Sequence, residues 1–416
     1  SGMDEIAPSM RIIYIHQYFR TPEEGGAVRS YHLAKGLVDA GFEVEMITAH
    51  DLPHYDQHWI DGFKVHYLSA PYDQKFSFFK RTLAFFSFVW RAKKLLQKLS
   101  RPDLLYITST PLTTGLIGLW AKRNLALPYL FEVRDLWPEA PIQVGAIRNY
   151  FLKKALYRLE KRIYDQSMGL VALSPGIAAH LKNISPSKSV ALIPNFSSLE
   201  TFFPQQKDRK ALYSLGLSDS LTISYTGALG RVNAVEELLQ LADMAKNEGK
   251  NWNFLIMGKG SHEKILKEKA QEMGLDRVRF IPFGPKEKVN QILSVTDLAW
   301  ISFAHLPVLK TNSPNKFFDA LAAGKPILVN HKGWVYDLVK THRIGISCLP
   351  GKMEKAFAKL ENLEQNKEEL KSMGIRSRKL AETYFSKELA VSRLFEFIRP
   401  QKPNLTQGGE VDIRTA

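Results

Sequence analysis

The chain has 416 residues, a mass of 47.3 kDa, a single cysteine and a formal net charge of +15. This length exceeds what one hydrophobic core usually supports, so it predicts two domains of roughly 180 residues each. A single cysteine excludes a disulfide framework and fits a reducing cytosol. The positive charge requires an anionic partner, which leaves nucleic acid, a membrane surface or a phosphorylated substrate.

The sequence predicts neither a signal peptide nor a membrane-spanning segment. Ser1-Gly2 before Met3 resembles an expression remnant, and no basic and apolar signal follows it. The strongest apolar stretch, 82–90, has nine residues between Arg81 and Arg91, whereas a bilayer requires about 20. We therefore expect a cytoplasmic protein.

In the first half of the chain, short runs of β-branched or aromatic residues alternate with amphipathic helices. Runs typical of strands cover 11–15, 44–48, 63–68, 104–107, 129–132, 169–173 and 190–193. Helices are expected from Ala27 and after Ser77. Strands that alternate with helices predict a doubly wound parallel sheet, so we expect an N-terminal Rossmann-like domain over residues 10–196.

The same alternation begins again in the second half. Runs typical of strands cover 221–225, 254–257, 278–281, 298–301 and 327–329. The fold class is therefore α/β, with a second Rossmann-like domain over 197–383 that faces the first across a cleft. We expect a helix over 384–398 to pack back on the N-terminal domain, and 399–416 to be a disordered tail.

Glycines follow the first strand of each half and precede the next helix. They are Gly25 and Gly26 in the first half and Gly227, within the segment that ends at Arg231, in the second. Glycine lets the backbone approach a ligand closely, a helix N-terminus offers N–H groups to an anion, and an arginine can meet a diphosphate. The alternatives are glycines that only close turns and an arginine that is simply solvated.

Residues 313–328 join a polar loop, a short helix and a buried strand. Such a junction can present backbone N–H groups, Asn315 and Lys316 to a phosphate, while the carboxylate of Asp319 accepts sugar hydroxyls. Lys259 ends a neighbouring strand between glycines, a position typical of a wall against a nucleobase. The pattern predicts a nucleotide-sugar site.

The segment 132–139 gathers carboxylates, an arginine and a tryptophan at the end of a predicted strand. Open sheets present ligands at this edge, so Arg134, Asp135 and Glu139 are candidates for the acceptor side. The alternative is a structural ion pair between Arg134 and either Glu132 or Asp135.

The helix after Ser77 is basic and has no acidic residue over 76–101. On a helical wheel the stripe expected to face the core consists of Phe78, Thr82, Phe85, Val89, Ala92, Leu96 and Leu99. Beside the cationic face lies a belt expected to insert among anionic headgroups, made of Phe79, Leu83, Phe86 and Trp90 with Arg91 and Lys94. The alternative is that these aromatic residues pack under a loop. A second basic helix over 148–162 would extend the patch.

Several classes of protein are disfavoured. The histidines are scattered over the chain and no Asp-x-Asp pair is present, so no metal is expected. Neither the phosphate-loop motif nor the nucleophile elbow is present. A nucleic-acid binder is suggested only by charge, since no recognition motif accompanies it.

Taken in order, these residues resemble the retaining glycosyltransferases of family four, which have the GT-B fold, and within them the fucosamine-transferase-like branch of bacterial surface-polysaccharide assembly. The segments that carry the resemblance are 15–19, Gly25-Gly26, 29–34, 41–44, 134–139, 193–195, 313–316 and 323–326. They span nearly the whole chain from Met10 to about Phe397.

The resemblance implies transfer of a sugar from a nucleotide diphosphate sugar, usually UDP-linked, with retained anomeric configuration and without a metal or other cofactor. It places Asp319 at the ribose hydroxyls, Gly25 and Gly26 over the donor, and Gly227 to Arg231 at the diphosphate. The sequence departs from the family at Ala228 and Asn233, where cationic residues are usual, and at Thr311, where a glutamate is usual. We infer that Arg231 and Lys316 supply the positive charge instead.

The site that we expect therefore has two sides. Its catalytic candidates are Arg231, Lys316 and Asp135; its donor side adds Lys259 and Asn315, and its acceptor side consists of His16, Arg134, Asp135 and Glu139. The preferred function is transfer from a UDP-N-acetylhexosamine type of donor to a lipid-linked or saccharide acceptor at the inner membrane surface. A UDP-sugar epimerase of the same fold and a non-catalytic nucleotide-sugar-binding protein are the alternatives.

Overall fold

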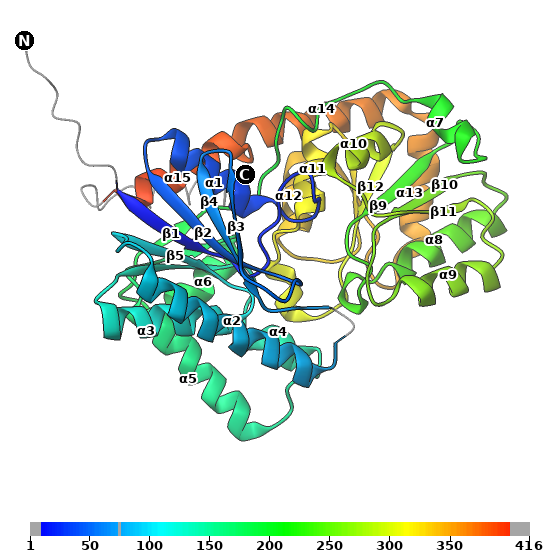
Figure 1. Ribbon diagram of the computed structural model, residues 1–416. Coiled ribbons are helices and arrows are strands. Elements are labelled where there is room, and N and C mark those ends of the chain that lie inside the picture. The colour runs from blue at the N-terminus through cyan, green and yellow to red at the C-terminus, as the bar shows by residue number, and fades with distance from the viewer. Residues whose placement is uncertain (1–9, 74–75, 400–416) are drawn as a thin grey trace, which may run out of the picture. The chain divides into compact units, whose positions relative to one another are not determined.

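The computed structural model describes residues 10–73 and 76–399, which form two compact α/β units (Figure 1). Of these described residues, the first unit comprises 10–21, Ala27–Pro194 and 390–399, and the second comprises Pro22–Gly26 and Asn195–Leu389. The tail expected to be disordered, 400–416, lies outside the described residues.

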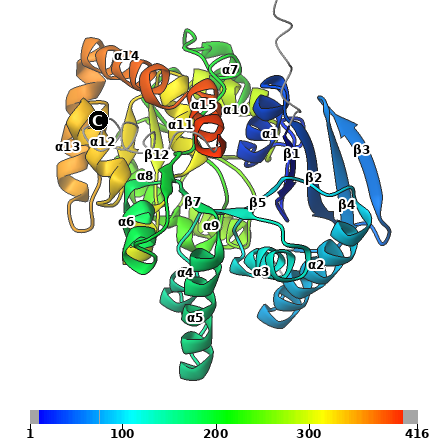
Figure 2. The same cartoon turned by 90° about the vertical axis from the view of Figure 1, so that its left-hand side faces the viewer.

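The first unit is built on an eight-stranded sheet in the order β3-β4-β2-β1-β5-β6-β7-β8. Its strands are β1 (Arg11–Ile15), β2 (Glu43–His50), β3 (Asp56–Ile60), β4 (Phe63–Ser69), β5 (Leu104–Thr108), β6 (Tyr129–Val133), β7 (Gly169–Ala172) and β8 (Val190–Leu192). All pairs are parallel except β3 with β4, at the outer edge that Figure 2 shows. Every strand predicted in this half is confirmed, but β3 was missed because its side chains are largely exposed and polar.

The helices of the first unit lie on both faces of this sheet. They are α1 (Arg29–Asp39), α2 (Phe78–Lys98), α3 (Gly115–Leu125), α4 (Glu139–Gln143), α5 (Tyr150–Gln166), α6 (Pro175–Ile184) and the short η1 (Leu112–Thr114). Helices α2, α3 and α5 cover one face. On the other face, α15 (Lys387–Ile398) packs on α1, because Gly36 leaves room for Val391 and Phe42 contacts Phe395 edge to face.

The second unit is a six-stranded parallel sheet in the order β11-β10-β9-β12-β13-β14. Its strands are β9 (Thr222–Thr226), β10 (Asn253–Met257), β11 (Val278–Ile281), β12 (Leu298–Ile301), β13 (Ile327–Val329) and β14 (Gly345–Ser347). Its helices are α7 (Arg209–Ser214), η2 (Arg231–Asn233), α8 (Glu236–Asn247), α9 (Glu263–Glu272), α10 (Lys286–Ser294), η3 (Pro307–Thr311), α11 (Asn315–Ala322), α12 (Trp334–His342), α13 (Met353–Gln365) and α14 (Lys367–Tyr384). The five strands predicted here are confirmed, and β14 was missed.

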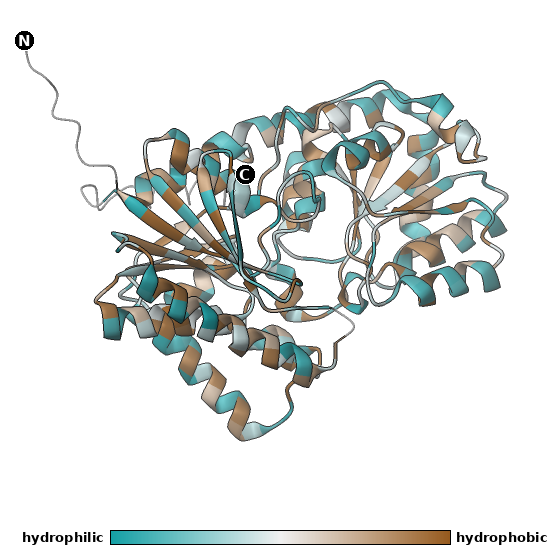
Figure 3. Ribbon diagram, in the orientation of Figure 1, coloured by the Kyte–Doolittle hydropathy of each residue, from teal (hydrophilic) through white to brown (hydrophobic). Residues whose placement is uncertain are grey.

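Alternating side chains of the second sheet feed two separate cores. Tyr225 and Trp300 face a cluster that includes α8 and α13, whereas Ile301 and Val329 face one that includes α11, α12 and α14. Both faces are buried, and β10, β12 and β13 are nearly continuous hydrophobic runs, whereas β9 also carries buried threonine and serine; brown segments mark hydrophobic residues in Figure 3. The fold class predicted from the sequence, two doubly wound parallel sheets, is confirmed.

Candidate active site

In each sheet the order of the strands reverses at one point, and open α/β sheets bind ligands there, beyond the carboxyl ends of the strands. In the first unit this switch point lies between β1 and β5, and in the second between β9 and β12. The loops after these four strands are therefore the places where a ligand site is expected.

Lys316, near the start of α11, reaches across the switch point of the second unit. Its Nζ lies 3.0 Å from the hydroxyl of Tyr225, which belongs to β9, and 4.6 Å from the centre of that ring. The ring of Phe303, which follows β12, is 5.1 Å away. Among the residues that the structure describes, Lys316 pairs with no carboxylate, and burial lowers the pKa of its amine to about 7.

Glycine is needed beside this lysine. A Cβ at Gly227, directly after β9, would lie 3.0 Å from Cε of Lys316 and 3.3 Å from its Nζ. The loop after β10 packs equally closely, since a Cβ at Gly258 would lie 1.8 Å from the carbonyl oxygen of Gly227. The loops after β9 and β10 thus contact each other through their backbones, and the first of them also contacts the amine.

The carboxylate of Asp319 is held within the protein. Its Oδ1 accepts a hydrogen bond of 2.9 Å from the hydroxyl of Ser197, and its Oδ2 lies 2.9 Å from Nζ of Lys286. Asp319 and Lys286 are both buried. Sequence reasoning missed Lys286 and expected Asp319 to be available to a ribose; in the structure both carboxylate oxygens already have partners.

The residues that follow Pro194 are hydrogen-bonded to α11 and to Ser313, which precedes this helix. The backbone N–H of Asn195 donates to Oγ of Ser313 at 3.1 Å, and its side-chain amide donates to the carbonyl of Ser313 at 2.6 Å. Together with the hydrogen bond from Ser197 to Asp319, these bonds hold both the residue before α11 and the middle of the helix.

The remaining donor candidates are more open. Arg231 is exposed at the start of η2, and Asn315 is the first residue of α11. The amine of Lys259 lies 4.5 Å from the centre of the Phe283 ring. Gly25 packs on the same ring, since its Cβ would lie 3.1 Å from Phe283 Cζ, and both Gly25 and Gly26 have positive φ.

Two of the departures from the family pattern have local structural roles. The side-chain oxygen of Asn233 accepts the N–H of Gly230 at 3.0 Å and so closes the turn that carries Arg231. The hydroxyl of Thr311 donates to the carbonyl of Val308 at 2.9 Å within η3. Neither residue replaces the charge that is usual at its position.

In the first unit, a buried carboxylate organises the carboxyl ends of β5 and β6. Glu132 is fully buried; its Oε1 accepts from Arg29 Nε at 2.9 Å and from the Tyr106 hydroxyl at 2.6 Å, and its Oε2 accepts from the Thr108 hydroxyl at 2.6 Å. Burial alone would raise the pKa of Glu132, but Arg29 and Arg134 outweigh it and hold the pKa at about 2.

Arg134 is part of this network. Its Nε donates to the Thr108 hydroxyl at 2.8 Å and lies 3.3 Å from Glu132 Oε2, and its Nη2 donates to the Ser30 hydroxyl at 2.6 Å. The structural ion pair considered from the sequence is thus present between Arg134 and Glu132. Asp135 stands apart from it: its carboxylate accepts a hydrogen bond from the Thr110 hydroxyl at 3.1 Å, and burial raises its pKa.

His16 and Glu139 occupy different surroundings. His16 directly follows β1 and is buried; burial and then the nearby Arg134 keep its pKa well below the ordinary value. Glu139, at the start of α4, accepts hydrogen bonds from Gln143 and from the hydroxyl of Tyr157 on α5. The structure therefore groups His16 with Arg134 but ties Glu139 to helix packing.

The belt of apolar residues on α2 is exposed. Phe79, Leu83, Phe86 and Trp90 are between 52% and 70% exposed, and Lys94 holds its amine 3.7 Å from the centre of the Trp90 ring. The core-facing stripe was partly wrong: the buried residues are Ala84, Phe88, Val89, Ala92 and Leu96. Phe78 is exposed, and the buried residues of α2 begin only at Ala84.

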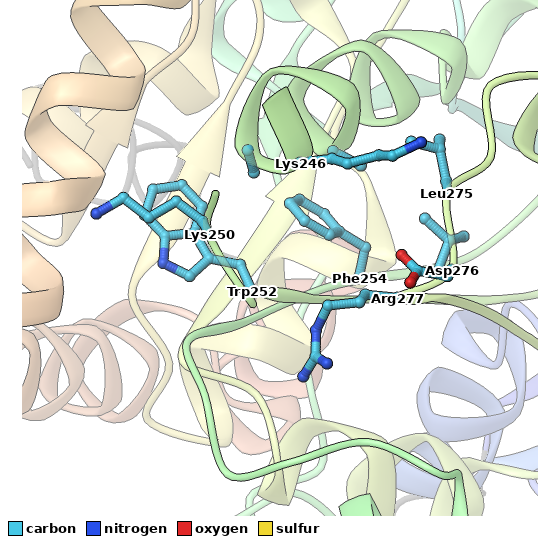
Figure 4. A pocket seen from close by; sticks show the side chains of 10 residues that line it. Lys246, Lys250, Trp252, Phe254, Leu275, Asp276 and Arg277 are labelled. Carbon is cyan, nitrogen blue, oxygen red and sulfur yellow. The ribbon is translucent and has the colours of Figure 1, made fainter. Parts of the chain in front are cut away.

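A small hollow elsewhere in the second unit has no part in this chemistry. It has a volume of about 30 Å³, room for about one water molecule, and Figure 4 shows Trp252, Phe254 and Arg277 in its wall. It lies at the amino ends of β10 and β11, the edge away from the switch point. Over residues 10–73 and 76–399 there is also no group of three or more histidine, cysteine or acidic side chains placed to hold a metal ion.

Comparisons with known proteins agree with this architecture. Residues 24–195 match the family model described as the glycosyl transferase 4-like domain, and residues 212–380 match that of the glycosyl transferases group 1. The two matches together span most of the chain, which therefore belongs to the glycosyltransferases of the family 4 and group 1 type.

An uncharacterized glycosyltransferase of Methanocaldococcus jannaschii is 23% identical over 338 residues, which are 78% of this chain and 81% of the relative. Sucrose-phosphate synthase from Thermosynechococcus elongatus superposes with a TM-score of 0.75 at 18% identity, covering 93% of this chain and 98% of its own. Anabaena HepE in complex with UDP-glucose has a TM-score of 0.70 at 14% identity, with 93% and 99% covered. The structural likenesses establish the GT-B fold.

Proposed function

We propose that this glycosyltransferase takes its sugar from a nucleotide diphosphate sugar, UDP-linked and of the N-acetylhexosamine type, and transfers it with retention of anomeric configuration. The acceptor is a lipid-linked or saccharide intermediate of bacterial polysaccharide assembly, as the resemblance to the fucosamine-transferase-like branch suggests. The observation that carries the proposal is Lys316, whose amine lies at the β9/β12 switch point and has no carboxylate partner in the part of the chain that the structure describes. HepE, of the same fold, is known in complex with UDP-glucose.

The chemistry that this site offers is electrostatic stabilisation of a leaving group. As the bond between the sugar and the diphosphate breaks, negative charge develops on the diphosphate. In this proposal the amine of Lys316, which lies beside Gly227, stabilises that charge together with the exposed guanidinium of Arg231 and the N–H groups at the start of α11. A phosphate oxygen of the leaving group accepts the proton of the acceptor hydroxyl, so that no metal ion and no strong protein base are needed.

On the donor, Lys259 and Phe283 flank the nucleobase and Asn315 adds a contact to the phosphates. Because both oxygens of Asp319 are bonded, it reaches the ribose only together with Lys286: the pair presents a hydrogen-bond acceptor and a donor to a cis-diol. On the acceptor side, Asp135 with its raised pKa and the guanidinium of Arg134 orient the incoming hydroxyl.

A panel of nucleotide sugars tests this function. We expect release of nucleotide from UDP-N-acetylhexosamines only when a lipid-linked saccharide is supplied, at the same rate with and without EDTA, and a product of retained anomeric configuration by NMR. A sugar epimerised at C2 without any acceptor would instead establish an epimerase. Binding of nucleotide sugar without turnover of any donor would establish a non-catalytic protein.

We also propose that the enzyme works at the anionic inner surface of the cytoplasmic membrane. No helix within residues 10–73 and 76–399 is long and apolar enough to cross a bilayer. The surface of α2 offers exposed rings beside Arg91 and Lys94, and α5 adds exposed Tyr150 and Phe151 beside lysines. Rings inserted among headgroups, with about 1 kcal/mol from each nearby cation, suit a peripheral contact.

Changing Phe79, Phe86 and Trp90 together to serine is expected to reduce association with phosphatidylglycerol vesicles at least about tenfold in a sedimentation assay, because the inserted apolar area is lost. The matched control changes Phe203, Tyr213 and Ile375, which are exposed on the second unit, to serine and should leave association unchanged. Equal binding by both triple variants would refute this membrane surface.

A further inference from the structure

Two consecutive residues at the switch point of the first unit have buried polar atoms without partners. His16 and Gln17 follow β1 and are 4% and 1% exposed. Among the described residues, Nδ1 of His16 and both the amide nitrogen and the amide oxygen of Gln17 have no hydrogen-bond partner. Leaving such atoms unpaired in a protein interior is costly, so a cluster of them requires an explanation.

The backbone of this segment, in contrast, is anchored to β2 by three hydrogen bonds. The N–H of His16 donates to the carbonyl of Ile47 at 3.0 Å, and the carbonyl of Gln17 accepts from the hydroxyl of Thr48 at 3.1 Å and from the N–H of Ala49 at 3.2 Å. The two side chains are therefore presented on a rigid support. On the β5 side of the same switch point, the buried hydroxyl of Thr113 in η1 also has no partner within residues 10–73 and 76–399.

These groups suit an uncharged ligand. Burial, together with the positive charges of Arg134 and Arg20, keeps the imidazole of His16 neutral, although Glu132 acts in the opposite direction. A neutral imidazole and a carboxamide both donate and accept hydrogen bonds, which matches the hydroxyl groups of a sugar.

A row of aromatic rings connects this polar corner with α2. The ring of Tyr18, next to Gln17, lies 4.9 Å from that of Tyr72, which in turn stacks on Phe85 of α2 at 6.0 Å. Phe85 neighbours the exposed Phe86 in the chain. The row thus runs from the switch point of the sheet to α2, the helix that also carries the exposed apolar belt.

We propose that the β1/β5 switch point binds an amphiphilic acceptor: Gln17 and His16 hydrogen-bond the hydroxyls of its uncharged sugar, and its apolar aglycone follows Tyr18, Tyr72 and Phe85 toward α2. This inference rests on the proposed function, whose acceptor it specifies. Gln17 and His16 then act as specificity-determining residues, and the partnerless atoms acquire their hydrogen bonds from the acceptor.

The first test replaces Gln17 with leucine, a side chain of similar volume. Because the amide has no partner in the free protein, thermal stability should stay the same or rise, while calorimetric binding of an octyl glycoside should weaken about tenfold or more. Gln271, exposed on α9, gives the control Gln271→Leu, which should bind like the wild type. Unchanged binding by a folded Gln17→Leu protein would overturn the site.

The second test compares octyl and methyl glycosides of the same sugar. The wild type should favour the octyl glycoside about tenfold, since its chain covers the aromatic row, and Tyr72→Ala should erase most of that preference. The exposed Tyr213 supplies the control Tyr213→Ala. A preference that survives in Tyr72→Ala would overturn the route for the aglycone.

These measurements separate the inference from the function on which it rests. Glycoside binding requires no donor, so its loss in Gln17→Leu would support the acceptor site even if no nucleotide sugar were turned over. Conversely, turnover of donor by a wild type whose glycoside binding does not depend on Gln17 would uphold the proposed function and refute this site.

Discussion

Replacing Lys316 with methionine is expected to abolish measurable binding of UDP-N-acetylglucosamine and, at the same time, to stabilise the protein. The amine lies near the rings of Tyr225 and Phe303, and none of the described carboxylates pairs with it. Methionine keeps the apolar stem and removes the desolvated charge. We expect loss of more than about a hundredfold in affinity, as for a cation that contacts a phosphate directly.

The gain in stability depends on pH in a definite direction. Burial lowers the pKa of Lys316 from 10.5 to about 7, so between these values the unfolded chain binds the additional proton. The loss of folding stability caused by burying the protonated amine is therefore complete below pH 7 and disappears as the pH rises to 10.5. Since the residue keeps some contact with solvent, we expect a gain of about 1–2 kcal/mol at pH 7 in denaturant unfolding, declining toward zero at high pH.

Affinity for the donor should follow the same titration. The protonated amine binds the diphosphate, so above pH 7 the free enzyme must take up a proton, and the dissociation constant of the wild type should rise with pH. Calorimetry in buffers of different ionisation enthalpy would detect that proton. A pH-independent dissociation constant in the wild type, or a destabilised Lys316→Met variant that still binds donor, would contradict the role of Lys316.

Replacing Glu132 with glutamine should cost the first unit about 3–5 kcal/mol of unfolding free energy, because it leaves the buried guanidinium of Arg29 without its counter-charge. The change is nearly isosteric, so the loss reports charge and not volume. Glu263, in the exposed i,i+4 pair with Lys267, provides the control Glu263→Gln, with an expected loss of at most about 0.5 kcal/mol.

Acid should reveal the same interaction. The folded pKa of about 2 lies below the ordinary 4.5, so the stabilisation by Glu132 is complete above pH 4.5 and is lost as the pH falls toward 2. The difference in unfolding free energy between the wild type and Glu132→Gln should become smaller as the pH falls over that range. Combining Arg29→Met with Glu132→Leu should recover part of the stability; equal stabilities of the wild type and Glu132→Gln at pH 7 would contradict the assignment.

Much of the fold could be predicted because strand periodicity and glycine position are local properties of the sequence. The strand before Gly227 and the helix that carries Lys316 can both be predicted from these local patterns. The β3 strand was not, because Gln57, His58 and Trp59 are exposed and its edge position depends on pairing with β4. On α2 the wheel placed Phe85 in the core, whereas Phe88 is the fully buried ring, because the packing partners fix the rotation of a helix.

The sequence predicted site residues only where their position follows from the local pattern, and not where it depends on partners from distant segments. Lys316 follows from its position at the start of a helix, but its aromatic surroundings come from β9 and from the chain after β12. Lys286, the partner of Asp319, lies on a different helix, and no local pattern marks it. Gln17 could have been noticed as a polar residue at the end of the first strand, but its lack of partners is a property of the folded interior.

The hydrogen bonds from Asn195 and Ser197 to Ser313 and Asp319 have a mechanical consequence. The peptide that leads out of β8 ends directly on the helix that carries Lys316. Any shift of α11 is therefore passed to Asn195 and Ser197, which adjoin one of the points where the backbone crosses between the two units.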